Sequence, residues 1–181
     1  MAHVSRWICN AVERGVLEMD LDLWTTCEVF LPCALVTSKT LVISRCVKHG
    51  LILPVFKNLV NLSFWGGNKR GWKLLPYLIK QSPKLNTLII QGLDNYTGDV
   101  TMHLLKVKVF HVLGYGGTPN ELEHLKSILG GVTECLELVQ VEFAQGVTVD
   151  DHGTILQTHD PRWSCSIHVQ DRLLRIARRS S

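Results

Sequence analysis

Candidate metal ligands gather in one polar stretch near the end of the chain, VDDHGTILQTHDPR. It contains Asp150, Asp151, His152, His159 and Asp160. Carboxylates and imidazoles are metal ligands, but one loop without a supporting scaffold rarely fixes a tetrahedral or octahedral geometry. We therefore predict a solvated polar loop and no metal site. The alternative is a hydrolase or metal enzyme that uses Asp151, His152 and His159.

Two other segments carry residue types that could support chemistry. The run LGYGGTPNELE places Gly114 and Gly116 between an expected strand and an expected helix, as in a phosphate-binding loop. The dinucleotide fingerprint needs a glycine where Pro119 stands, and no Gly-Lys-Ser/Thr follows. His124 and Cys135 could be imagined as a thiolate pair, but nothing orients them or supplies an oxyanion site. We predict no catalytic residue and no cofactor, and hence a protein that is not an enzyme.

Composition limits the remaining classes. Of the 181 residues, 46% are hydrophobic and 19% are charged, and the net charge is +3. This is enough apolar material for a core and too little charge to indicate nucleic-acid binding. The first residues, MAHVSRWICN, have no apolar core of signal-peptide length, and no apolar stretch approaches about 18 residues, so we expect no membrane span. Six cysteines without a C-x-x-C pair, among them Cys46, Cys135 and Cys165 at strand-like positions, favour reduced, buried thiols in an intracellular protein.

One pattern recurs along the chain and dominates the prediction of fold. NLVNLSFWGG, KLNTLIIQGL and CLELVQVEF each follow the order apolar-x-x-apolar-x-apolar. Their spacing fits one or two periods of roughly 20–29 residues, which is typical of leucine-rich repeats. The apolar positions expected to point inward are Leu59, Leu62, Phe64, Leu85, Leu88, Ile90, Leu136, Val139 and Val141.

Between these strands the sequence predicts helices and irregular connections. Thr118, Pro119 and Glu121 make a capping box with proline at the first helical position, so a helix is expected over 119–129. Pro76 is placed in the first turn of a helix over 72–82. We predict a further helix over 4–14, strands over 17–23, 40–46, 59–65, 86–91, 106–113, 136–143 and 165–169, and a helical arginine-rich tail over 171–181.

The fold class is therefore α/β, with mostly parallel strands on one face of a solenoid and helices or irregular connections on the other. Such proteins usually bind through a surface rather than a catalytic pocket. Trp65 is a candidate anchor, since exposed tryptophans are typical of binding sites, although it could instead pack against Trp72 or the neighbouring strand. The residues predicted to bind on the outward strand face are Asp20, Asp22, Ser63, Trp65, Gln91, Gln140 and Glu142.

Longer segments resemble the plant F-box/FBD/LRR proteins. VSRWICNAVERGVLEMDLDL resembles the start of their repeat region, and LPYLIKQSPKLNTLIIQGL is similar to their late repeats. LLKVKVFHVLGYGGTPNELEHLKSILGGVTECLELVQVEF resembles the FBD segment that ends these chains. The resemblance implies a leucine-rich-repeat region over 4–99 with middle repeats missing, an FBD domain over 100–170, and a basic tail over 171–181.

In that family an N-terminal F-box binds the Skp-type adaptor of a cullin ubiquitin ligase, and the repeats are thought to recruit the target. No F-box precedes residue 4, so we expect no adaptor surface. The resemblance then implies a non-enzymatic substrate-recognition module that binds an unknown target protein, with no nucleic-acid or membrane partner. The alternative is a truncated decoy or a structural interaction protein without a link to ubiquitination.

Overall fold

A computed structural model describes residues 18–22, 37–44, 53–67, 71–96, 106–130, 135–145, 163–168 and 173–178. For 18–22, Ser44, Gly130, 163–168 and 173–178 only the backbone is described. The helix predicted over 4–14 and the loop that carries Asp150 to Asp160 lie outside these residues.

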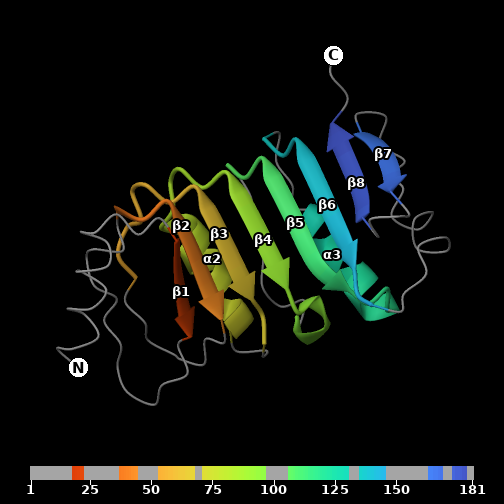
Figure 1. The fold of residues 1–181 in the computed structure, drawn as a ribbon, viewed down its shortest axis with the longest axis horizontal. Coiled ribbons are helices and arrows are strands. Elements are labelled where there is room, and N and C mark those ends of the chain that lie inside the picture. The colour runs from red at the N-terminus through yellow and green to blue at the C-terminus, as the bar shows by residue number, and fades with distance from the viewer. Residues whose placement is uncertain are drawn as a thin grey trace.

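The described strands form one sheet, in the order β1-β2-β3-β4-β5-β6-β8-β7 (Figure 1). Neighbouring strands from β1 to β6 are parallel. β8 pairs antiparallel with β6, and β7 pairs antiparallel with β8. The α/β class with mostly parallel strands is thus confirmed. The strands are β1 (Glu18–Asp22), β2 (Thr40–Ser44), β3 (Asn61–Trp65), β4 (Thr87–Gln91), β5 (Val109–Tyr115), β6 (Leu138–Phe143), β7 (Trp163–His168) and β8 (Leu173–Arg178).

The helices of the described residues cover one face of this sheet (Figure 1). They are the short 3-10 helices η2 (Gly71–Leu74) and η3 (Leu93–Asn95) and the α-helices α2 (Leu75–Lys80) and α3 (Pro119–Gly130). Pro76 lies in the first turn of α2, where its missing N–H leaves no helical bond unmade. The other face of the sheet carries no described helix.

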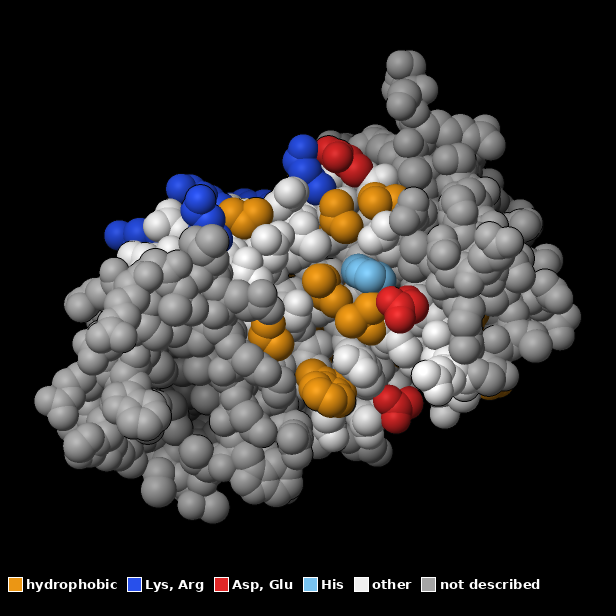
Figure 2. Space-filling view, in the orientation of Figure 1, with side chains coloured by type: hydrophobic (Ala, Val, Ile, Leu, Met, Phe, Trp, Pro, Cys, Tyr) orange, Lys and Arg blue, Asp and Glu red, His pale blue; other side chains and the backbone are white. Residues whose placement is uncertain are grey.

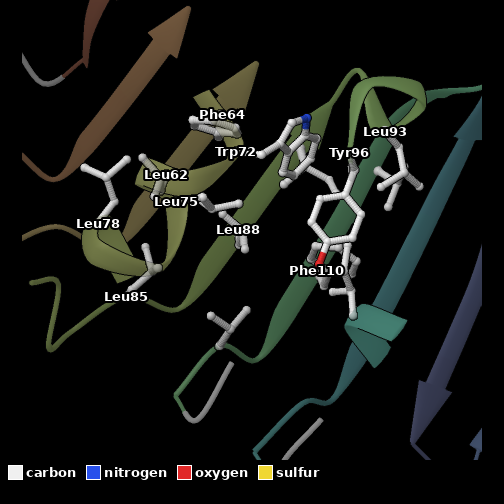
Figure 3. Close-up of a cluster of buried hydrophobic side chains, with 14 of the residues drawn as sticks. Leu62, Phe64, Trp72, Leu75, Leu78, Leu85, Leu88, Leu93, Tyr96 and Phe110 are labelled. Atoms are coloured by element: carbon white, nitrogen blue, oxygen red, sulfur yellow. The ribbon is translucent and has the colours of Figure 1, made fainter. Parts of the chain in front are cut away.

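The core lies between the sheet and these helices (Figure 3). Because the parallel strands are in register, Leu62, Leu88, Phe110 and Val139 form one row across β3 to β6. A second row contains Phe64, Ile90, Val112 and Val141. All nine apolar positions predicted from the recurring pattern are at most 2% exposed, which confirms that they point inward. Strand alternation places one apolar face toward the helices.

Two sequence predictions are wrong. The arginine-rich segment near the C-terminus was expected to be helical, yet Leu173–Arg178 is strand β8. The unpaired edge of β6 offers a row of N–H and C=O groups, and pairing with that edge outweighs a helical preference that is only local. Cys135 was expected to be buried but is exposed, because it lies in a turn before β6 rather than within the strand.

Candidate functional site

The face of the sheet opposite the helices is the candidate site, and we call it the strand face. Its side chains alternate with the core positions of β3 to β6, so the backbone that holds them is anchored by fully buried neighbours. Figure 2 views this face and shows apolar side chains beside a histidine and acidic groups. The strand face consists of Asn61, Ser63, Trp65, Thr87, Ile89, Gln91, Val109, His111, Leu113, Leu138, Gln140 and Glu142.

Trp65 is the largest exposed side chain of the strand face. It ends β3, and 45% of it is exposed. It does not pack against Trp72, because Trp72 is fully buried on the helix side. There the rings of Trp72 and Phe64 meet edge-on with centroids 5.4 Å apart, and strand alternation turns Phe64 away from Trp65. The indole of Trp65 is therefore available from solvent on a rigid strand.

Register brings further apolar groups near this tryptophan. Trp65 lies opposite Gln91 in β4, and Gln91 lies opposite Leu113 in β5. Ile89 stands two residues before Gln91, on the same face. Trp65 and Leu113 thus flank Gln91 across the sheet and Ile89 precedes it on the same face, so three apolar residues neighbour one with a side-chain amide. An aromatic anchor among apolar and amide neighbours is typical of protein-binding surfaces.

A titratable pair borders this area. His111 in β5 lies opposite Gln140 in β6, and its Nε2 is 3.9 Å from Oε2 of Glu142. The Glu142 side chain is 51% exposed and that of His111 is 21% exposed. The pair is an attractive ion pair only when the imidazole is protonated.

The structure describes the side chains of five of the seven binding residues predicted from the sequence, and these five lie on one face. Ser63, Trp65, Gln91, Gln140 and Glu142 all lie on the strand face. For Asp20 and Asp22 the backbone alone is described, and register places them beside Val42 and Ser44, in the rows that lead to Ser63 and Trp65. Sequence reasoning did not include His111 and Leu113 among the binding residues. Their alternation with Phe110 and Val112 was a visible signal, but only the register shows which neighbours they join.

The loop before α3 binds a carboxylate of the protein itself, that of Glu121. The Glu121 carboxylate accepts hydrogen bonds from the backbone N–H of Gly116 and of Thr118, both at 3.0 Å, and from Oγ1 of Thr118 at 2.9 Å. The Glu121 N–H in turn donates to Oγ1 of Thr118 at 3.2 Å, which confirms the predicted capping box. The N–H groups that could have held a phosphate are thus occupied by a buried carboxylate.

The other chemical candidates are also held in packing roles. Nδ1 of His124 is 3.2 Å from the carbonyl oxygen of Leu93, and its ring meets that of Tyr96 edge-on. Burial, with a contribution from Glu121, raises the pKa of Tyr115 to about 12. Within the described residues there is no group of three or more His, Cys, Asp or Glu side chains placed to hold a metal. No helix in that same part of the chain is long and apolar enough to cross a membrane.

Comparison with known proteins gives sequence relatives. The chain is 51% identical over 148 residues to F-box/LRR-repeat protein At3g60040 of Arabidopsis thaliana, a match that covers 81% of this chain and 32% of the relative. It is 54% identical over 89 residues to F-box/LRR-repeat protein At1g06630 and 41% identical over 105 residues to F-box/LRR-repeat protein At2g42730 of the same organism. These two matches cover 49% of this chain each, and 22% and 23% of the relatives.

The chain therefore spans about a third or less of the length of these relatives. No family model matches the sequence, and no solved structure matches it. An identity of 51% over 81% of the chain nevertheless establishes common descent with the first of these relatives. Over the part that it shares with these relatives, the chain belongs to the family of plant F-box/LRR-repeat proteins.

Proposed function

We propose that this chain is a non-enzymatic protein-interaction module that binds a target protein through the strand face. Its role would resemble that of the substrate-recognition part of an SCF-type ubiquitin ligase. The relatives, named as F-box and LRR-repeat proteins, support this assignment. So does a parallel sheet in register, which fits a leucine-rich-repeat solenoid followed by an FBD unit over 100–170.

The observation that carries the proposal is the exposure of Trp65. A tryptophan that is 45% exposed loses contact with water in a complex, and the buried rows behind β3 keep it in place at little entropic cost. The neighbouring Ile89, Gln91 and Leu113 provide apolar contact and an amide. Catalytic chemistry would require convergent polar groups in a cavity, whereas this face is broad and mixes apolar with polar side chains.

Site-specific photo-crosslinking in plant cells tests the proposal. A photoreactive phenylalanine analogue at Ser63 or Gln140 should yield the same covalent partner, and the same analogue at the exposed Lys126 on α3 serves as the matched control. Adding Trp65→Ala should remove the crosslink while leaving the free energy of unfolding within about 0.5 kcal/mol of the parent. Equal products from all three positions, or a product that is indifferent to Trp65, would contradict the assignment.

In the alternative, the chain is a decoy that binds the same target without a link to ubiquitination. Two measurements on the chain separate the roles: retention of a Skp-type adaptor, and the ubiquitin load of the crosslinked target. If the chain acts as the recognition part of a ligase, adding it should change the ubiquitination of the target, and this change should require complexes that contain the adaptor. A decoy predicts protection of the target from the full-length relatives, with no adaptor retained.

A further inference from the structure

A second surface lies away from the strand face, on the helix side of the sheet. A groove with a volume of about 590 Å³ lies between α2 and the segments that enter β4 and β5. Pro76, Ile79, Pro83, Leu85 and Val107 contribute apolar walls. The hydroxyl of Ser82, which also lines the groove, is already engaged at 2.6 Å with the carbonyl oxygen of Leu78. The groove is therefore mostly apolar and has little unfilled hydrogen-bonding capacity of its own.

The rim of the groove is aromatic and cationic. Tyr77 is 64% exposed at this rim. Lys80 and Lys106 also line the groove, and both are exposed. None of the lining residues that the structure describes is acidic. A partner that fills this groove must therefore bring an apolar group and carry negative charge beside it.

The cationic character continues beyond the groove along one edge of the sheet. Lysine side chains gather at the edge where the parallel strands begin, as Figure 2 shows. Lys39 immediately precedes β2, and Lys108 immediately precedes β5. Backbone hydrogen bonds connect the residues that precede neighbouring strands: Val60 N donates to Lys39 O, and Lys108 N donates to Asn86 O. Nζ of Lys84 reaches Oδ1 of Asn58 at 3.5 Å, which places Lys84 beside Lys57. We call this the lysine edge: Lys39, Lys57, Lys84, Lys106 and Lys108.

Carboxylates are scarce near the lysine edge within the described residues. Glu137 bonds Lys108 at 2.8 Å, and this contact together with the Glu137 charge raises the pKa of Lys108. Strands β3 to β6 contain one carboxylate, Glu142, which lies near the end of β6, away from the lysine edge. Charge is thus separated along the strand direction, so the lysine edge favours an anionic partner and the opposite edge does not.

We propose that the groove and the lysine edge together bind an acidic peptide segment that carries a bulky apolar side chain. The apolar side chain enters the groove under Tyr77, and the flanking carboxylates meet Lys80, Lys106 and Lys84. Adjacent strands are about 4.8 Å apart, so the lysine edge offers cations in a row. A chain with several carboxylates matches such a row, whereas an amphiphile with a single head group does not.

Nucleic acid is a poorer fit to the same observations. Binding of single strands depends on several aromatic rings for base stacking, and among the described groove residues only Tyr77 is aromatic. Two prolines and three aliphatic side chains instead suit a leucine or phenylalanine side chain. This site is separate from the strand face, so it adds a second contact for partners rather than restating the first.

Fluorescence anisotropy with a defined probe tests the proposal on the full chain. The probe is a short labelled peptide in which Asp and Glu flank a Leu-Phe pair. One control peptide replaces the acids by Asn and Gln, a second replaces Leu-Phe by Ser-Ser, and an oligouridine strand of equal length is the nucleic-acid control. The acidic Leu-Phe peptide should bind with saturation and weaken as salt rises, and each change to the peptide should reduce its affinity.

Variants of the protein locate the binding. Lys106→Glu and Tyr77→Ala, both at exposed positions, should each lower the affinity about tenfold. Lys126→Glu on α3, where Lys126 pairs with Glu123 at 3.1 Å, changes the net charge equally and should leave the affinity unchanged. Trp65→Ala should also leave peptide binding unchanged, so failure here is distinct from failure of the strand-face proposal. Equal losses in Lys106→Glu and Lys126→Glu, absence of saturation, or tighter binding of oligouridine would overturn the proposal.

Discussion

Gly66, directly after β3, allows a close packing contact in the core to be tested by adding a single methyl group. A Cβ built on Gly66 would lie 2.2 Å from Cε2 and 2.3 Å from Nε1 of the Trp72 indole. Carbon atoms in contact sit about 3.5–4.0 Å apart, so Gly66→Ala forces one partner to move. Position 66 therefore requires glycine, because the Trp72 indole leaves no space for a Cβ atom.

Neither partner can move at low cost. Trp72 is fully buried, and its ring meets Phe64 and Tyr96 edge-on with centroids 5.4 and 5.1 Å away. The Gly66 N–H donates to the Gln91 carbonyl at 2.8 Å, so a backbone shift would strain that bond. Overpacking costs about 1–3 kcal/mol, and expulsion of the indole would approach the roughly 3–5 kcal/mol of a deleted core aromatic. We expect Gly66→Ala to lower the free energy of unfolding by about 3 kcal/mol.

Urea denaturation followed by circular dichroism measures this loss, with an unchanged m-value as the sign that the same cooperative unit unfolds. Gly114→Ala is the matched control, because Gly114 has φ of +67° and no atom within 4 Å of an added Cβ. It carries backbone strain without a clash and should cost about 1 kcal/mol. In a Trp72→Leu background the cost of Gly66→Ala should fall, giving a coupling energy of about 1–3 kcal/mol. An undiminished cost in that background, or a cost no larger than that of Gly114→Ala, would refute the reasoning.

Three further predictions concern the core and the start of α3. Glu121→Ala removes the acceptor for Gly116 and Thr118 and should cost about 2–3 kcal/mol in urea denaturation, whereas Glu121→Gln, which keeps an oxygen acceptor, should cost less. The pKa of Tyr115 is about 12 in the folded protein, above the ordinary 10.0 of the unfolded chain. The contribution of Tyr115 to stability therefore falls as the pH rises from about 10 to about 12. Its loss amounts to at most about 2–3 kcal/mol, and Tyr115→Phe should flatten the alkaline decline of the melting temperature; an identical decline in both proteins would contradict this. Leu88→Ala, at a fully buried position, should cost about 2–5 kcal/mol by the same denaturation assay, and a loss below 1 kcal/mol would argue against the core row.

Local patterns in the chain were sufficient for the elements that their own residues specify. The apolar-x-x-apolar-x-apolar runs place Leu62 and Leu88 inside because strand alternation depends only on neighbours in sequence. The start of α3 was predictable for the same reason, since Thr118 and Glu121 satisfy backbone groups within one helical turn. Trp65 was a candidate from its residue type and its position between buried neighbours.

Tertiary structure decided what depends on partners distant in the chain. Register between strands brings Leu113 and His111 beside Gln91 and Gln140, and no local pattern contains that information. The groove under Tyr77 likewise combines α2 with segments that enter two different strands. Leu173–Arg178 is a strand because the edge of β6 needs hydrogen-bond partners, a demand that lies outside the segment itself. Residue types thus set which side of each strand is apolar, whereas backbone pairing between distant segments determined which side chains became neighbours.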